Sequence, residues 1–483
     1  MPSAFTPQAW SQFVPWANRQ LWLYGCDLAT ELLQAREEGR DLSSVEKEFK
    51  RLANIERDAG YLEQMLSGKR GPRWFVDACA LSDRVQTLPQ RRGYPYVEPS
   101  DLAEIRAQRE RQKRLPKWRG SKAELIRRVR GGFLGRVAGC MLGKPFEGVD
   151  RRSIRLYGEA TGNWPLKNYQ RSPTPAELRR IMAQKPVRPA LGWQASFYID
   201  RNECFPSDDD INYTLLGMEV MRKHGRNFTS LDMATLWTMQ LPIIATCTAE
   251  RIAYRNFVEG RLPPESATHR NPCREWIGAQ IRADFFGYSA PGDPALAAEW
   301  AWRDASMSHV KNGIYGEMWV AAMLASAFVL SSWPEIIRAG LAQVPRRSRF
   351  RAGIDRILAE HASGRTFEEI MDGVHREWNE LTHHGGVHTI SNAQVVAASL
   401  LCGNDDFATT IGLAVSAGFD TDCNGATCGS LWGVRHGDTE IPAKWLKPLK
   451  NCIRSGLQEY PVGPLDKLAD KVAEVAVSIA QQR

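Results

Sequence analysis

Glycine recurs at every fourth position of the segment 131–143, which reads GGFLGRVAGCMLG. Residues four apart lie on the same face of an α-helix. Gly131, Gly135, Gly139 and Gly143 would therefore leave one helix face almost without side chains. A smooth face of this kind suits tight packing against a neighbouring element. The segment predicts a helix in close contact with another part of the chain.

Apolar residues follow helical spacing through most of the chain beyond residue 122. Alternating runs of β-branched residues are scarce, and WQASFYID, residues 193–200, is the best single candidate for a strand. The pattern predicts an all-α body. The expected helices are 123–142, 208–224, 229–239, 293–308, 313–331, 334–342, 351–362, 393–402, 405–418, 423–434 and 464–481.

A boundary is expected near residue 120, between an N-terminal region, 1–120, and a body, 121–483. Residues 5–66 have helical spacing, and residues 101–130 hold a surplus of seven positive charges out of a net charge of +8. Such a stretch can attract nucleic acid. Acidic residues are interspersed, however. Proteins that bind single-stranded nucleic acid usually place aromatic residues between the basic ones, and this segment does not. We therefore interpret residues 101–130 as a solvated helical linker. For the N-terminal region three roles stay open: it docks a protein substrate, covers a cleft or makes an oligomer.

The ten cysteines lack the regular short spacings of a disulfide or zinc framework. Cys26, Cys140, Cys402 and Cys452 lie among apolar residues and are expected to be buried thiols, which indicates a reducing compartment. The most apolar stretch, residues 318–330, is too short to cross a bilayer. We expect a cytoplasmic protein with no membrane contact.

Two acidic segments each precede an expected helix. The first is FPSDDDINY, in which Ser207, Asp208, Asp209 and Asp210 stand at the helix start. A single acid would suffice as an N-cap. Three consecutive aspartates repel one another, so a cation or solvent must offset the repulsion. By itself this segment is still compatible with a solvated acidic turn.

The second acidic segment is GFDTDCNG, residues 418–425, which matches the first half of an EF-hand loop. That loop must end in a bidentate Glu at its twelfth position, where this chain has Leu431. Calcium of the EF-hand type is excluded, but Asp420 and Asp422 still point to one side of an extended segment. Carboxylates without a Cys/His set favour a hard cation such as Mg²⁺ or Mn²⁺.

The glycine-rich helix ends in GKPFEG, a near match to a nucleotide-binding P-loop. Pro145 stands where a P-loop needs Ser or Thr to bind Mg²⁺, and the glycine spacing is also wrong. We therefore reject nucleoside triphosphate hydrolysis. Glu147 follows the helix end and is unremarkable on its own.

Together these segments resemble the signatures of the ADP-ribosylglycohydrolase family, which includes dinitrogenase reductase-activating glycohydrolase and the ADP-ribosylhydrolases. The glycine-rich helix ending in Glu147 resembles the first signature, SDDD the Thr-Asp-Asp motif, and GFDTDCN the Gly-Asp-Thr-Asp-Thr-Asn motif. RDASMSHVKNGIYGEMWVAAMLA is similar to the family's His-containing segment. The resemblance covers residues from about 131 to the C-terminus and implies a compact, orthogonal all-α domain around a cleft with two Mg²⁺ ions.

The resemblance also implies roles for individual residues. Glu147 and Asp209 would be catalytic, while His309, Arg282, Gly278 and Tyr315 would bind substrate. Arg282 could pair with a pyrophosphate or simply with Asp284. The implied metal ligands are Ser207, Asp208, Asp209, Asp420, Asp422 and Cys423. If the match of the first acidic segment shifts by one residue, Asp210 becomes a ligand as well.

Two positions depart from the family pattern. Cys423 stands where Thr or Ser is usual, and Cys140 stands where Asp is common after the glycine. A thiol is a poor ligand for Mg²⁺ and suits softer metals. Either water replaces the ligand, or the site prefers another ion such as Mn²⁺, or one metal binds weakly.

The implied activity is metal-dependent hydrolysis of the N-glycosidic bond of an ADP-ribosyl or related N-ribosyl substrate, either a protein adduct or a small NAD-derived metabolite. Cleavage of such a bond builds positive charge on the ribose ring, which fixed carboxylates can stabilise. The alternative is a catalytically weak or inactive nucleotide-binding module of the same fold. The cluster of His383, His384 and His388 lacks a Cys pair for zinc and is expected in a loop beside the cleft, with Asn392 starting a helix.

Overall fold

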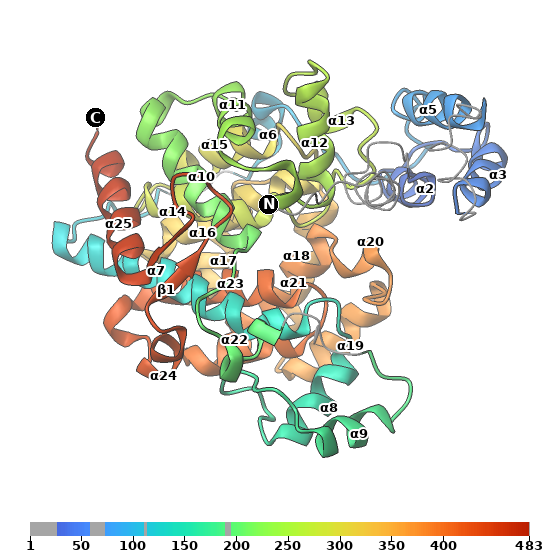
Figure 1. Ribbon diagram of the computed structural model, residues 1–483. Coiled ribbons are helices and arrows are strands. Elements are labelled where there is room, and N and C mark those ends of the chain that lie inside the picture. Colours follow the sequence, from blue (N-terminus) through green and yellow to red (C-terminus); the bar gives the residue numbers. More distant parts are fainter. Residues whose placement is uncertain (1–26, 58–72, 111–113, 189–194, 483) are drawn as a thin grey trace, which may run out of the picture.

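The structure is a computed structural model, and it describes residues 27–57, 73–110, 114–188 and 195–482. Helices make up almost all of the regular structure (Figure 1). The all-α prediction is confirmed. In the described part of the chain, no helix is both long enough and apolar enough to cross a membrane.

The N-terminal region forms a small helical unit beside the body (Figure 1). Its helices are α2 (Leu28–Glu37), α3 (Glu46–Arg57) and α5 (Arg73–Val85). They surround a separate apolar core that contains Leu28, Phe49, Leu52, Ala78 and Leu81. The chain then runs without regular structure to α6 (Leu102–Gln108), which lies against the body.

The body begins with α7 (Lys122–Gly143), and Ser121 caps this helix by accepting a hydrogen bond from the backbone N–H of Glu124. The eleven expected helices are all present, with ends that differ by up to four residues, whereas the helices over 151–161, 175–182, 248–258 and 367–377 have no expected counterpart. The remaining α-helices are α8 (Arg151–Thr161), α9 (Pro175–Met182), α10 (Asp209–His224), α11 (Ser230–Gln240), α12 (Thr248–Val258), α13 (Glu265–Thr268), α14 (Asp284–Tyr288), α15 (Pro294–Ala305), α16 (Asn312–Ala327), α17 (Trp333–Leu341), α18 (Arg349–Ala362), α19 (Phe367–Glu377), α20 (His383–Gly386), α21 (Thr389–Cys402), α22 (Phe407–Ser416), α23 (Thr421–His436), α24 (Ala443–Leu446) and α25 (Leu465–Gln481).

Short 3₁₀ helices join several of these elements. They are η1 (Lys144–Phe146), η2 (Ala195–Phe197), η3 (Ile199–Arg201), η4 (Gly225–Asn227), η5 (Ile243–Ala245), η6 (Gln280–Arg282), η7 (Asp438–Glu440) and η8 (Lys447–Leu449).

Helices α7 and α23 pack backbone to backbone at the centre of the body. A Cβ atom on Gly135 would lie 2.1 Å from the carbonyl oxygen of Gly429, and one on Gly131 would lie 2.4 Å from that of Gly433. No side chain fits at such a separation. The glycine row of α7 therefore has a matching row on α23, and this is the close contact that the sequence predicts.

The strand prediction for residues 193–200 is wrong. Residues 195–201 form η2 and η3 instead, and residues 193 and 194 lie outside the described part of the chain. The observed strands are β1 (Cys452–Arg454) and β2 (Val462–Pro464), which pair in antiparallel orientation. Phe205 forms a parallel bridge with Ile453 of β1. Backbone pairing to this distant segment, rather than local residue preference, decides where extended structure forms.

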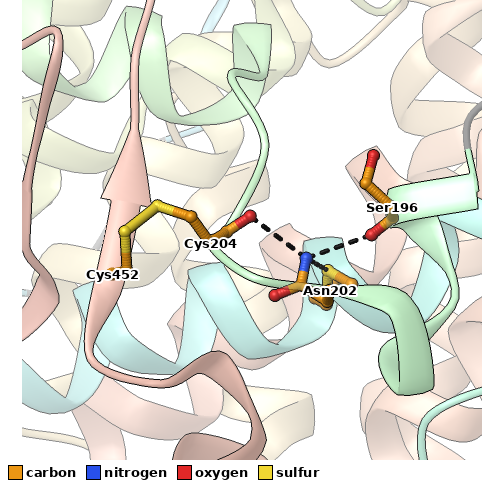
Figure 2. The surroundings of a disulfide bond; sticks show 5 residues. Ser196, Asn202, Cys204 and Cys452 are labelled. Atoms are coloured by element: carbon orange, nitrogen blue, oxygen red, sulfur yellow. Dashed lines mark hydrogen bonds between the residues drawn. A yellow bond between two sulfur atoms is a disulfide. The ribbon is translucent and has the colours of Figure 1, made fainter.

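The prediction of a buried thiol at Cys452 is also wrong, because Cys452 forms a disulfide with Cys204 across 248 residues of sequence (Figure 2). The disulfide joins β1 to the segment before Ser207. Asn202 holds that segment further by donating from its side-chain amide to the carbonyls of Ser196 and Cys204 (Figure 2). Cys140 and Cys402 are free cysteines, buried and half-buried respectively, and Cys26 lies outside the described residues.

The basic segment is not a solvated linker over its second half. The Arg128 side chain is buried and donates to the backbone carbonyls of Val434, Phe328 and Ala327. Arg130 forms ion pairs with Asp438 and Asp470. These arginines lie on α7, the central helix of the body, so their charges are used to hold helix ends in place.

Candidate active site

Lys144 lies at the centre of the acidic residues that the sequence singled out. Its ammonium nitrogen is 2.5 Å from Oδ2 of Asp208, 2.9 Å from Oδ2 of Asp422 and 3.1 Å from Oε2 of Glu147. The side chain is 9 % exposed. Although burial alone would lower it, the Asp208 and Asp422 carboxylates raise the pKa of Lys144 well above its ordinary value. One buried cation thus joins Glu147 to both acidic segments.

The first acidic segment forms the start of α10. Asp208 is the N-cap, and its Oδ1 accepts from the backbone N–H of Asp210 at 2.9 Å. Asp210 is fully buried, and its Oδ1 accepts from Arg136 of α7 at 2.7 Å. Arg136 also bonds to Asp284 at 2.8 Å. Asp210 is therefore held by a guanidinium, whereas Asp208 is held by Lys144.

The second acidic segment forms the start of α23. The side-chain oxygen of Asn392 accepts from the backbone N–H of Asp420 at 3.1 Å and from the amide of Asn424 at 2.8 Å. These bonds fix the turn before the helix. Ligand atoms of Asp420, Asp422 and Cys423 all lie within 4.8 Å of one another. This is an arrangement that could hold a metal ion.

A second group of potential ligands shares Asp422. Ligand atoms of Cys140, Asp208, Asp210 and Asp422 also lie within 4.8 Å of one another. This group already contacts both Lys144 and Arg136. The two groups therefore differ in charge: Lys144 and Arg136 contact three acids of the group with Cys140, whereas in the other group, among the described residues, a basic side chain contacts only Asp422.

Six carboxyl groups gather here, against two basic side chains. The Asp422 carboxylate raises the pKa of Glu147 to about 7. Burial raises the pKa of Asp420, and the neighbouring Asp422 carboxylate raises it further. Burial and Asp208 act in the same way on Asp209. Such a surplus of negative charge favours binding of a further cation.

A cavity of about 560 Å³ opens beside these residues, within the range of small-molecule sites. Among the predicted site residues, Glu147, Ser207 and Asp420 line it. His383, from the expected loop beside the cleft, also lines it. The other lining residues, which were not predicted from the sequence, are Lys144, Gly148, Val149, Arg188, Phe197, Glu380, Leu381, Thr382, Gly386, Val387 and Phe419. Two aromatic rings and a basic side chain suit a ligand with flat and anionic parts.

Arg282 does not pair with Asp284, contrary to one of the two expectations. Its guanidinium bonds instead to Glu250 at 2.8 Å, to Asp304, and to the hydroxyl of Ser308 at 3.0 Å. Asp284 forms an ion pair with Arg136 instead. Arg282 is almost fully buried, and it does not line the 560 Å³ cavity.

The remaining predicted substrate residues also lie away from this cavity. Gly278 lies against the carboxylate of Glu250, which a Cβ atom would meet at 1.9 Å. Tyr315 is buried, and its hydroxyl donates to the carbonyl of Pro99. His309 lines a different, mainly apolar cavity of about 810 Å³ beside α13 and α15. The structure thus brings together the acidic residues but does not bring Gly278, Tyr315 or His309 to the cavity beside them.

The three histidines separate into two roles. His383 lines the cavity, so this segment lies beside the cleft as expected, but it forms the short helix α20 rather than a loop. His384 accepts from the indole N–H of Trp276 through Nδ1, so its proton is on Nε2, which lies 3.0 Å from Glu37 of α2. His388 likewise accepts from the backbone N–H of Ile390 through Nδ1. A protonated Nε2 cannot bind a metal, so these two histidines hold the N-terminal region in place.

Asn392 lies inside α21, which begins at Thr389 with His388 as its N-cap, so the predicted helix start at Asn392 is wrong. His388 supplies the capping acceptor, and this leaves the amide of Asn392 free to donate to the carbonyls of Gly386 and His388. Asn392 serves the site by holding the Asp420 turn, a role with no sequence signal of its own.

The most important residue missed by the sequence analysis is Lys144. In the sequence it stands within a near match to a P-loop, which gives no sign of its contacts. Its partners Asp208 and Asp422 are far away in sequence, and only their family-like order hinted that the segments converge. Phe197 and Arg188 carried no recognisable motif.

Comparison with known proteins identifies the family of this chain. Residues 121–480 match the ADP-ribosylglycohydrolase family. The chain belongs to this family. The matched range starts at α7 and contains every acidic residue of the site, so the recognised resemblance is confirmed. No curated protein matches the chain.

One similar solved structure is a chain of an ADP-ribosylglycohydrolase-related protein complex. It has 18 % sequence identity and a TM-score of 0.46, and the match covers 74 % of this chain and 100 % of that chain. ADP-ribosylglycohydrolases are glycoside hydrolases, so membership indicates hydrolase activity in general. The N-terminal region, with α2 to α6, lies outside the family match.

Proposed function

We propose that this chain hydrolyses the N-glycosidic bond of an ADP-ribosyl or related N-ribosyl substrate in the cavity beside Glu147 and Asp420. The observation that carries the proposal is the convergence of Glu147, Asp208 and Asp422 on one buried point, next to a cavity of about 560 Å³. Family membership supplies the reaction class.

The proposal includes a divalent cation, Mg²⁺ or Mn²⁺, held by Asp420 and Asp422 with Asp209 nearby. These residues fit such an ion, because Oδ1 of Asp422 is buried and has no hydrogen-bond partner in the described part of the chain. Carboxylate oxygens suit hard cations, whereas the thiol of Cys423 suits softer ones. A bound cation would orient ribose hydroxyls and offset charge on the reacting groups.

The protein's own groups can do the remaining work. Glu147 lies at the cavity wall with its side chain 47 % exposed, and Lys144 donates to its Oε2. A carboxyl group at this place can exchange a proton with the substrate or with water. It can also stabilise positive charge on a ribose ring in an oxocarbenium-like transition state. Phe197 and Phe419 would exclude water from the ligand's flat faces.

The second candidate is a binding module without hydrolysis. Two observations favour it: Cys140 stands where Asp is common in the family, and Lys144 neutralises two of the carboxylates. This candidate predicts binding of ADP-ribose with no turnover of any N-ribosyl compound.

Hydrolysis assays separate the two. The chain would be incubated with Mg²⁺ or Mn²⁺ and, in parallel, with arginine-linked ADP-ribosyl protein and with NAD⁺, and released ADP-ribose would be measured. We expect release from one substrate class, and its loss in Glu147→Gln. Release that persists at the same rate in Glu147→Gln would contradict the assigned role. No release from either class, with ADP-ribose still bound, would establish the binding module.

A further inference from the structure

The side chain of Lys144 occupies a place that a metal ion would otherwise take. Its ammonium group has three N–H donors, and three carboxylate oxygens surround it, from Asp208, Asp422 and Glu147. The contacts with Asp422 and Glu147 are hydrogen bonds, and the contact with Asp208 is an ion pair. Three carboxylates thus hold the ammonium in this place.

The backbone also holds Lys144 in this place. Gly143 packs directly on the start of α23, where a Cβ atom would lie 2.4 Å from the backbone of Asp422. The hydroxyl of Thr421 donates to the carbonyl of Gly143 at 3.0 Å. The ammonium lies 5.2 Å from the ring centre of Phe197. The lysine is anchored immediately beside the aspartate that it neutralises.

The oxygens that Lys144 contacts are those a divalent ion would need. The group formed by Cys140, Asp208, Asp210 and Asp422 could hold a metal by spacing alone. Lys144 forms ion pairs with Oδ2 of Asp208 and Oδ2 of Asp422, and Arg136 forms one with Oδ1 of Asp210. Mg²⁺ requires oxygen ligands at about 2.0–2.1 Å in octahedral geometry. An ion bound by these same oxygens would lie close to the ammonium of Lys144, and the two positive charges would repel each other.

The neighbouring group has the opposite character. Asp420 lines the cavity and forms no ion pair with Lys, Arg or His in the described part of the chain. Oδ1 of Asp422, whose other oxygen bonds to Lys144, is buried without a hydrogen-bond partner there. An unpartnered buried carboxylate oxygen is costly unless a ligand satisfies it. Oδ2 of Asp210 in the first group is also buried without a hydrogen-bond partner there. The two positions therefore differ in charge: Lys144 and Arg136 contact the acids of the first group, and no basic side chain among the described residues contacts Asp420 in the second.

We propose that the ammonium of Lys144 permanently replaces one of the two divalent cations that the family resemblance implies, and that the chain binds a single divalent cation, at Asp420 and Asp422. The inference takes one point from the proposed function, namely that these acidic residues form a site for a divalent cation. The two Mg²⁺ ions expected from the resemblance do not both fit these residues.

Titration of the full-length, metal-stripped chain with Mn²⁺ tests this directly, because Mn²⁺ can be counted and its electron paramagnetic resonance spectrum reports on its neighbours. Ions in a two-metal site lie about 3.5–4 Å apart, close enough for their spins to couple. We expect one bound Mn²⁺ per chain with the six-line spectrum of an isolated ion. Two ions per chain, or none, would overturn the inference.

Lys144→Ala should then admit a second Mn²⁺ and produce a coupled spectrum. The matched control is Lys450→Ala, which removes an exposed lysine paired with Glu203 at 2.9 Å and should stay at one ion. A folded Lys144→Ala protein that still binds one ion would overturn the inference. If this variant does not fold, the wild-type ion count and spectrum decide alone.

Hydrolysis is scored separately, so that the two proposals can fail independently. Two coupled ions with release of ADP-ribose would overturn the replacement by Lys144 and leave the proposed function intact. One isolated ion without any release would support the replacement and count against hydrolysis.

Discussion

Gly139 of α7 and Gly425 of α23 lie in direct backbone contact, since a Cβ atom on Gly139 would be 1.9 Å from the carbonyl oxygen of Gly425. The glycine contacts continue in antiparallel order, with Gly143 against Asp422 at one end and Gly131 against Gly433 at the other. The C-terminal end of α7 therefore meets the first turn of α23. This packing is what brings Lys144 to Asp422.

Gly139→Ala should destabilise the protein, because the added methyl group has no space against the backbone of α23. Overpacking of this kind costs about 1–3 kcal/mol, and chemical denaturation would measure the loss. Gly463→Ala is the matched control, because a Cβ atom there meets nothing within 4 Å. Equal stability of the two variants would contradict the close contact.

Arg282→Met should destabilise the fold rather than only weaken ligand binding. The substitution would leave Glu250 and Asp304 buried without their cation, which typically costs 3–5 kcal/mol. Arg155→Met removes an exposed pair with Glu159 and should change stability by less than about 1 kcal/mol. Full stability of Arg282→Met together with weaker binding of ADP-ribose would instead assign the guanidinium to the substrate.

The disulfide between Cys204 and Cys452 should stabilise the chain, because it closes a loop of 248 residues. Removal of a natural disulfide commonly costs about 2–5 kcal/mol. The double variant Cys204→Ser/Cys452→Ser should unfold at lower denaturant than wild type, and a reducing agent should shift only the wild type. Peptide mapping by mass spectrometry without reduction would show the linkage. Two free thiols at these positions would contradict it.

Stability should fall as pH falls through the range of the His388 imidazole. Burial, aided by His384 and Arg349 and opposed by Glu37, lowers the pKa of His388 to about 3. Glu275 also faces this ring. The unfolded chain binds the proton near pH 6.5 and the folded chain does not, so stability is present above pH 6.5 and is lost below it.

From pH 7 to pH 5 this effect amounts to about 2 kcal/mol. His388→Asn keeps a capping acceptor at the start of α21 and should remove the extra loss, whereas His361→Gln on α18 should not. Denaturation of the three proteins at both pH values measures it. An equal loss in wild type and His388→Asn would show that His388 does not carry the effect.

Much of the body was predictable because its signals are local. Apolar spacing gives the helices, and the glycine row of α7 gives the close packing, since each depends on residues a few positions apart. The partner of Cys452 lies 248 residues away, and nothing near either cysteine marks the pair. WQASFYID resembles a strand, yet extended pairing occurs where Phe205 meets Ile453.

The site was predictable at the level of segments but not of contacts. Asp208, Asp420, Asp422 and Glu147 converge as their order along the chain suggested. The position of Lys144 among them could not be inferred, because it depends on how far α7 extends along α23. The partner of Arg282 likewise depends on which carboxylates the fold brings to it, and those belong to α12 and α15.

The most direct test of the central claim is calorimetric titration of ADP-ribose into the chain, with Mg²⁺ and after chelation, in wild type and in Asp420→Ala/Asp422→Ala. The account predicts that wild type binds ADP-ribose when Mg²⁺ is present, and that chelation or the double substitution weakens binding strongly while circular dichroism stays helical. Binding that is unchanged by chelation and by the double substitution, or that is absent from wild type with Mg²⁺, would contradict it.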